Sequence, residues 1–118
     1  MRGADRFRKR VAQRAATREN DIYVSRASRF GALLSRARKV VVSPKFDELH
    51  VHGMGAAMDV AVRLVLALRD EYPNALILSP RTSSVMLVDD YEPLVEGLPP
   101  ITRTRFTSKL TFTVRRRT

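Results

Sequence analysis

Arginines are the residues of this chain whose number and placement point most directly to a chemistry. Lysine and arginine together number 22 against 12 acids in 118 residues, which gives a net charge of +10. All but four of the 22 are arginine, whose planar guanidinium matches the oxygens of a phosphate. A chain of this kind predicts a polyanionic partner, and nucleic acid is the most common one.

The surplus charge is segregated along the chain. Residues 1–18, 22–46 and 101–118 each carry +6, whereas residues 47–100 carry −6. Segregation of this kind indicates that one surface meets phosphate and another meets something else, although charged ends also promote solubility. The candidate RNA-binding residues are Arg26, Arg29, Arg103, Arg105, Arg115 and Arg116.

Other polar residues allow weaker hypotheses. His50 and His52 share one face of a predicted strand, but the chain has no cysteine and no third histidine to complete a metal site. We interpret them as surface or interface groups that could stack on bases. The acidic cluster Asp89-Asp90-Glu92 would serve a metal-dependent nuclease that also uses His50. We read it instead as a solvated strand end or a contact for a basic partner, and we expect no catalytic residue, cofactor or metal.

Gly53-Met54-Gly55 joins a predicted strand to a predicted helix. Glycines at such a junction allow the backbone to approach a ligand anion at the helix start. Close packing of the helix on the strand explains the same glycines equally well.

Hydrophobic periodicity predicts six elements. Strands are expected at 22–24, 47–52, 76–88 and about 106–115, helices at 30–41 and 56–71, and a loop at 91–101. Pro80 leaves open whether 76–88 is a hairpin or one bulged strand. The order β-α-β-α-β-β predicts an α+β, two-layer fold, with two helices on one face of a four-stranded mixed sheet.

The predicted helix at 56–71 is apolar on nearly all sides. Such a helix is buried on more than one side, which a chain of this size hardly achieves alone. We therefore expect a protein partner that contacts Val62, Val65 and Leu66.

The chain divides into a basic arm at 1–20 and a domain at 21–118. The arm has too few apolar residues to anchor a helix, so we expect it to be flexible until it meets a partner. Its Arg-rich composition also fits a mitochondrial presequence. No apolar run reaches the roughly 20 residues of a membrane helix, so we expect no membrane association.

The motif His52-Gly-Met-Gly-Ala56 with the Ala-rich helix after it resembles the Alba superfamily of nucleic-acid-binding proteins. Within that superfamily, the sequence is most similar to the smaller Alba-type subunit family of nuclear ribonuclease P and ribonuclease MRP. Two further stretches carry the resemblance, Thr82-Ser-Ser-Val-Met-Leu-Val-Asp-Asp-Tyr-Glu-Pro93 and Thr102-Arg-Thr-Arg105.

The resemblance implies an Alba-like fold, with residues 76–88 in one long, bent strand. It implies a non-catalytic, RNA-binding subunit that pairs with a second Alba-type subunit and clamps an RNA stem-loop in the nucleus and nucleolus. Such a subunit would support tRNA 5′ maturation and rRNA processing beside other ribonucleoprotein subunits. Arg26 matches the basic turn after the first strand that Alba proteins direct towards nucleic acid. Gly53 and Gly55 match the family's loop before the second helix, and Arg103 and Arg105 match its basic strand-four hairpin.

One departure from the family pattern bears on the glycine loop. Many Alba proteins carry a basic residue between the two glycines, where this chain has Met54, which favours contact with a partner subunit over contact with phosphate. Another function remains open, that of a free-standing Alba-type protein that binds RNA or chromatin as a homodimer.

Overall fold

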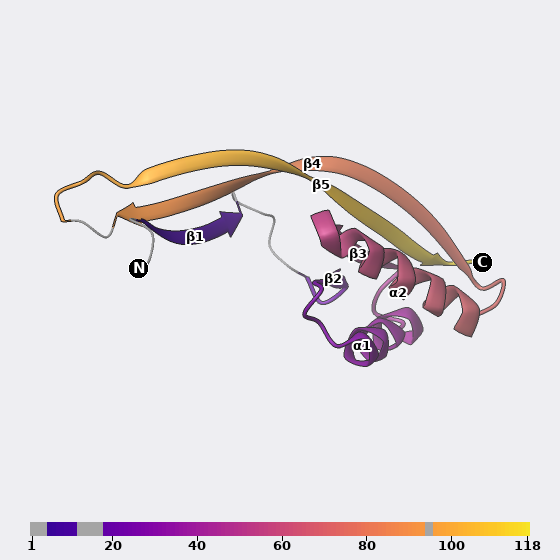
Figure 1. Cartoon of the computed structure of the whole chain (residues 1–118). Helices are drawn as coiled ribbons and strands as arrows, with labels where there is room; N and C mark the ends of the chain where they lie inside the picture. The colour runs from indigo at the N-terminus through magenta and orange to yellow at the C-terminus, as the bar shows by residue number, and fades with distance from the viewer. Residues whose placement is uncertain (1–4, 12–17, 94–95) are drawn as a thin grey trace. The chain divides into compact units, whose positions relative to one another are not determined.

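The computed structural model describes residues 5–11, 18–93 and 96–118, with the side chains of 18–90 and 96–118. The chain forms two compact units (Figure 1). The body comprises residues 16–83 and 108–118, and the hairpin unit comprises residues 1–15 and 84–107.

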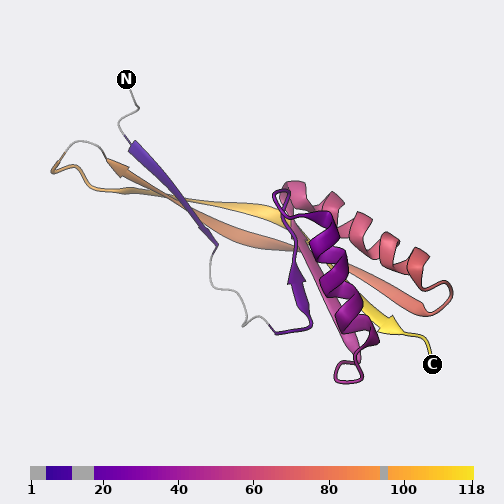
Figure 2. The same cartoon turned by 90° about the horizontal axis from the view of Figure 1, so that it is seen from below.

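The body contains two helices and strands of a mixed sheet. Strand β2 (Asp21–Tyr23) pairs parallel to β3 (Glu48–Met54), and β3 pairs antiparallel to the end of β5 (Ile101–Arg116). Helices α1 (Phe30–Val42) and α2 (Met58–Glu71) pack on the same face of this sheet (Figure 2). A 3₁₀ turn, η1 (Gly55–Ala57), leads from β3 into α2.

The core of the body follows from the two hydrophobic periods in the sequence. On β3, Leu49 and Val51 are buried towards the helices, and Glu48, His50 and His52 lie half-exposed on the other face. This alternation is the period of two expected of a strand with one covered face. Helix α1 contributes Leu33, Ala37, Val40 and Val41, which recur at helical spacing.

Helix α2 is less enclosed than its composition predicts. Its buried residues are Val60, Ala61, Leu64, Val65 and Leu68, and these form a single stripe towards the sheet and α1. Leu66 is 37% exposed and Val62 is half-buried on the outer side. The described residues therefore bury this helix on one side only.

Strands β4 (Leu76–Pro93) and β5 are longer than the sequence predicts. Strand β4 runs through Pro80 as one strand, as the family resemblance implies, and ends at Pro93, so the expected loop at 91–101 begins three residues too early. Phe106 shares the alternating positions of Phe112 and Val114, which are buried, but it is itself 71% exposed. Regular alternation predicts a shared face, but it does not predict whether another layer covers that face.

Strand β1 (Asp5–Val11) lies inside the segment expected to be a flexible arm. It pairs antiparallel with the end of β4, from Asp5 opposite Pro93 to Val11 opposite Leu87. Sequence reasoning missed this strand because a run dominated by basic residues has little intrinsic strand signal. The flexibility expected for residues 1–4 and 12–17 lies outside the described residues.

The strands are hydrogen-bonded in the order β1-β4-β5-β3-β2. The predicted order β-α-β-α-β-β corresponds to β2-α1-β3-α2-β4-β5 and is confirmed, with β1 as a fifth strand. The helices within the described ranges are all too short or too polar to span a membrane.

Candidate nucleic-acid interface

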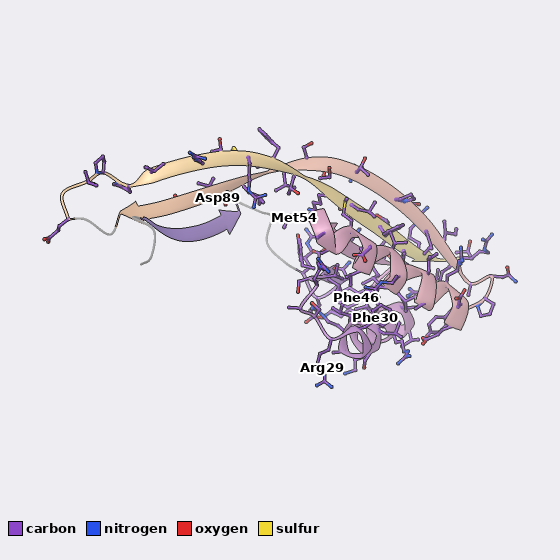
Figure 3. The ribbon with its side chains drawn as sticks, viewed as in Figure 1. Arg29, Phe30, Phe46, Met54 and Asp89 are labelled. Carbon is purple, nitrogen blue, oxygen red and sulfur yellow. The ribbon has the colours of Figure 1, made fainter. Side chains whose placement is uncertain are left out.

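The turn between β2 and α1 presents Arg26 and Arg29 to solvent. The Ser28 N–H donates to the Ser25 carbonyl at 3.1 Å, and the Ser25 N–H donates to the Ser28 hydroxyl at 3.1 Å. Ser28 thus closes the turn, and Arg29 occupies the N-cap position of α1. Arg29 projects away from α1 (Figure 3). Among the described residues, neither arginine has an intramolecular partner, so both can contact phosphate.

The two arginines at the end of β5 have different roles. Arg115 is exposed. Arg116 donates through Nη1 to the Val41 carbonyl at 2.8 Å and through Nη2 to the Phe46 carbonyl at 2.7 Å. Carbonyls at a helix end lack intrahelical donors, so Arg116 closes the C-terminus of α1. Arg116, expected as an RNA ligand, thus also has a structural role.

In the hairpin unit, Arg103 and Arg105 also differ in their interactions. Arg103 is exposed without a partner among the described residues. Arg105 donates through Nε to Oδ2 of Asp89 at 2.9 Å, and the Asp89 side chain is only 8% exposed while that of Arg105 is 45% exposed. Arg105 therefore neutralises a buried carboxylate, and only part of its guanidinium faces solvent.

The acidic cluster differs from the expected solvated strand end. Asp89 and Asp90 are adjacent on β4 and so fall on opposite faces of the strand: Asp89 is buried, and Asp90 accepts a hydrogen bond from the Thr102 hydroxyl at 3.3 Å. Asp89 and Asp90 lie opposite Lys9 and Arg8 of β1 in the strand register. The basic partner considered for these acids is therefore a segment of the same chain.

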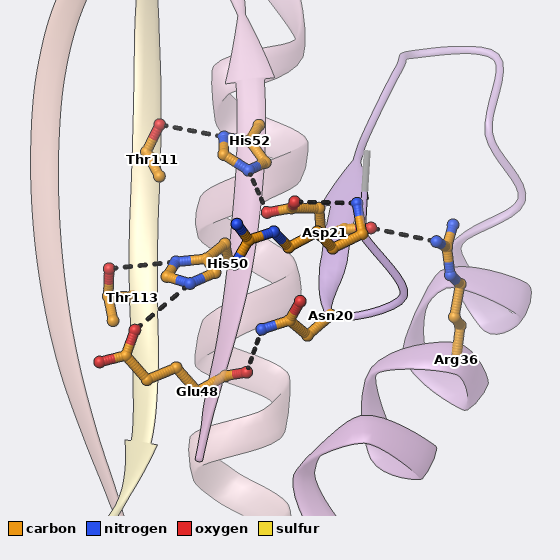
Figure 4. A network of polar contacts seen from close by, with 9 residues as sticks. Asn20, Asp21, Arg36, Glu48, His50, His52, Thr111 and Thr113 are labelled. Carbon is orange, nitrogen blue, oxygen red and sulfur yellow. Dashed lines mark hydrogen bonds and ion pairs between the residues drawn. The ribbon is translucent and has the colours of Figure 1, made fainter. Parts of the chain in front are cut away.

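The two histidines belong to a polar network on the open face of the body's sheet (Figure 4). Nε2 of His52 lies 3.0 Å from Oδ1 of Asp21, and its Nδ1 lies 3.2 Å from the Thr111 hydroxyl. His50 is placed in the same way between Glu48, at 3.3 Å, and Thr113, at 3.4 Å. The histidines are thus held in place by neighbouring strands.

Burial lowers the pKa of His52, and this effect outweighs the hydrogen bond with Asp21, which raises it. Burial also favours a raised pKa for Asp21, but its hydrogen bonds with His52 and the Arg18 N–H prevail, and its pKa is lowered. At pH 7 a neutral imidazole therefore faces a carboxylate. Because a carboxylate only accepts, Nε2 of His52 carries the proton and Nδ1 accepts from Thr111.

The imidazole of His52 also stacks on Tyr23, with ring centres 4.3 Å apart and planes inclined by 12°. Nζ of Lys109 lies 5.6 Å from the centre of the same Tyr23 ring. One face of His52 is thus already covered, which limits the base stacking considered for it. No cluster of three metal-binding side chains occurs within the described part of the chain.

Gly53, the first residue of the glycine loop, allows α2 to pack closely against β3. Gly53 is buried, and a Cβ there would lie 2.7 Å from the Ala57 carbonyl oxygen and 3.0 Å from the Ala61 Cβ. Gly55 has a φ of 53°, a left-handed conformation that favours glycine. Met54 is half-buried between them. Of the two readings of the motif, the geometry at Gly53 supports close helix packing.

We predict that Gly53→Ala lowers the free energy of unfolding by about 1–2 kcal/mol, because the added methyl group overpacks the junction between β3 and α2. Chemical denaturation followed by circular dichroism measures the change. Gly31→Ala is the matched control, since a Cβ there meets nothing within 4 Å. An unchanged denaturation midpoint for Gly53→Ala would show that the junction has room.

The residues expected to contact a partner differ in accessibility. Val65 is fully buried in the chain's own core, so we correct its role to a core residue. Val62 and Leu66 are one helical turn apart on the outer side of α2, where both are accessible to a partner.

Two features escaped sequence reasoning. The stack of Tyr23 on His52 joins strands separated by a helix, and the sequence carries no signal for it. Strand β1 had one available signal, the basic residues of 6–10 matching the acids of 89–92 in an antiparallel sense.

The fold defines a class of protein. The solved structure titled "Crystal structure of ALBA1 from Trypanosoma brucei" superposes with a TM-score of 0.60, covering 86% of this chain and 72% of that one at 17% identity. The chain therefore has the Alba fold, as its sequence predicts.

The family within this class follows from sequence. The model of the Rpp20 subunit of nuclear RNase MRP and P matches residues 17–113. The ribonuclease P protein subunits p20 of Bos taurus, Mus musculus and Homo sapiens are each 34% identical over 109 residues, covering 88% of this chain and 78% of theirs. The chain belongs to the Rpp20 family, and it is an accessory, nuclear subunit rather than a catalyst. The nuclease hypothesis is thereby set aside.

Proposed function

We propose that this chain binds the RNA of ribonuclease P and MRP and, paired with a second Alba-type subunit, clamps and stabilises an RNA stem-loop. In this role it supports tRNA 5′ maturation and rRNA processing, in the nucleolus as well as elsewhere in the nucleus. Membership of the Rpp20 family is the observation that carries the proposal. RNA provides the phosphates that a chain of net charge +10 attracts.

The arginines that have no partner among the described residues support RNA contact. Arg26, Arg29 and Arg115 in the body are exposed, and so is Arg103 in the hairpin unit. An arginine not engaged by a carboxylate can release counterions from RNA at little cost, whereas a paired arginine must first lose its partner. We therefore rank these four above Arg105 and Arg116 as phosphate ligands.

The outer side of α2 supports pairing with a second subunit. Leu66 and the half-buried Val62 form an accessible apolar stripe on this helix, and Ile77 of β4 in the same unit is 36% exposed. Apolar groups left accessible on a small basic domain favour burial against another protein. A second Alba-type subunit offers the same kind of surface in return.

We expect Arg26→Ala and Arg103→Ala each to weaken RNA binding and to reduce the slope of log affinity against log salt by about one unit, because each removes one phosphate contact. Fluorescence anisotropy with a synthetic RNA stem-loop over a series of salt concentrations measures both quantities. Arg69→Ala is the control, since Arg69 already lies 4.0 Å from the Asp70 carboxylate. Slopes equal to the parent's in both variants would place these arginines away from the RNA.

A further inference from the structure

The acidic end of β4 is matched by the basic residues of β1. In the antiparallel register, Arg6 lies opposite Glu92, Arg8 opposite Asp90, and Lys9 opposite Asp89. Cross-strand pairs of opposite charge stabilise a sheet, and like charges destabilise it. The register therefore explains why this basic segment docks on this strand edge.

One basic residue of β1 has no acid opposite it on β4. Arg10 lies opposite Val88, an apolar residue. The arginines at 6, 8 and 10 occupy alternate positions, which share one face in any strand. In the register, each of the three acids of β4 thus lies opposite a basic residue of β1, and Arg10 is the basic residue of β1 that has no acid opposite it.

The hairpin unit needs this charge if it is to bind RNA. Residues 84–107 contain four acids and two arginines, a net charge of −2, and one of the two arginines is committed to the buried Asp89. Strand β1 contains four basic residues and one acid, a net charge of +3. With β1 in place, the combined charge becomes +1, and an acidic hairpin becomes able to approach phosphate.

We propose that β1 is an RNA-binding element of this protein, docked on the β4 edge by Asp90 and Glu92 opposite Arg8 and Arg6, and contacting phosphate through Arg10, which has no acid opposite it. The inference rests on the proposed RNA-binding function and adds a site to it. The site lies outside residues 17–113, the range that the family model matches.

The decisive variants separate docking from RNA contact. In the full 118-residue chain, Arg10→Gln should reduce the salt slope by about one unit, and Arg6→Gln/Arg8→Gln/Arg10→Gln, which also removes the docking charges, should reduce it by at least as much, for a synthetic RNA stem-loop. The matched control is Arg69→Gln/Arg81→Gln/Arg117→Gln, which removes the same charge from exposed positions of the body. We expect its slope to change by less than half as much.

Docking is tested independently by hydrogen exchange. The backbone amides of residues 6–10 should be protected in the parent and in Arg10→Gln, and Asp90→Asn/Glu92→Gln should lower that protection at least tenfold. Unprotected amides in the parent would overturn the docked strand. An RNA affinity that is unchanged, or raised, in the triple arginine variant would overturn the RNA contact. A parent chain that shows no salt-dependent RNA binding would instead overturn the proposed function itself.

Discussion

Val65→Asp is expected to prevent folding of the chain. Val65 is 0% exposed and lies in the core between α2 and the sheet. A carboxylate placed there either remains charged without a partner or takes up a proton, and either outcome costs several kcal/mol. That cost is a large part of the roughly 5–15 kcal/mol that stabilises a typical domain. Circular dichroism and thermal melting should show an unfolded or strongly destabilised protein.

The adjacent residue provides the control that separates folding from pairing. Leu66 is 37% exposed on the outer side of α2, so Leu66→Asp should leave the melting temperature almost unchanged. If this side of α2 pairs with a second Alba-type subunit, Leu66→Asp should weaken co-purification with that subunit by at least tenfold. A folded Val65→Asp would contradict the core, and a fully paired Leu66→Asp would contradict the interface.

Arg105→Ala is expected to destabilise the hairpin unit by about 2–3 kcal/mol. The substitution leaves the carboxylate of Asp89 buried without its ion pair, and Oδ1 of Asp89 has no hydrogen-bond partner among the described residues even in the parent. Breaking a buried pair costs about 3–5 kcal/mol, and we reduce this value because Arg105 is half-exposed and water screens it. Hydrogen exchange of residues 87–90 and 101–107 reports the change.

Two comparisons isolate the ion pair. Arg103→Ala, two residues earlier on the same strand, removes an exposed guanidinium that has no partner in the described part of the chain, and it should change hairpin stability by less than about 0.5 kcal/mol. Asp89→Asn in the Arg105→Ala background should recover much of the loss, because an amide is less costly to bury than an unpaired carboxylate. Equal effects of Arg103→Ala and Arg105→Ala would mean that the pair does not stabilise the hairpin.

Much of the fold was predictable because hydrophobic periodicity is a local property. The alternation of Leu49 and Val51 with the histidines placed β3, and the spacing of Leu33, Ala37 and Val41 placed α1. The same reasoning predicted the element order and the two-layer class. The family resemblance added the continuity of β4 through Pro80, which local patterns left open.

The sequence predicted which type of residue makes up the candidate site, but not which individual residues are available to bind. Sequence alone identified arginine as the chemistry of this protein and indicated a nucleic-acid partner. It could not rank the arginines, because whether a guanidinium is available depends on which carbonyl or carboxylate the fold brings to it. Arg116 donates a hydrogen bond to a carbonyl at the end of α1, and Arg105 forms an ion pair with Asp89. Arg26 and Arg103, in contrast, are exposed.

The amino-acid sequence by itself determined the charge, the periodicity of the helices and strands, and the close helix contact that only glycine allows at position 53. The tertiary structure decided which side of α2 is covered, which arginines are paired, and that basic residues 5–11 lie beside the acidic end of β4. The reason is the range of the interactions: periodicity and backbone sterics act between near neighbours in the chain, whereas burial and charge pairing depend on residues brought together across many positions.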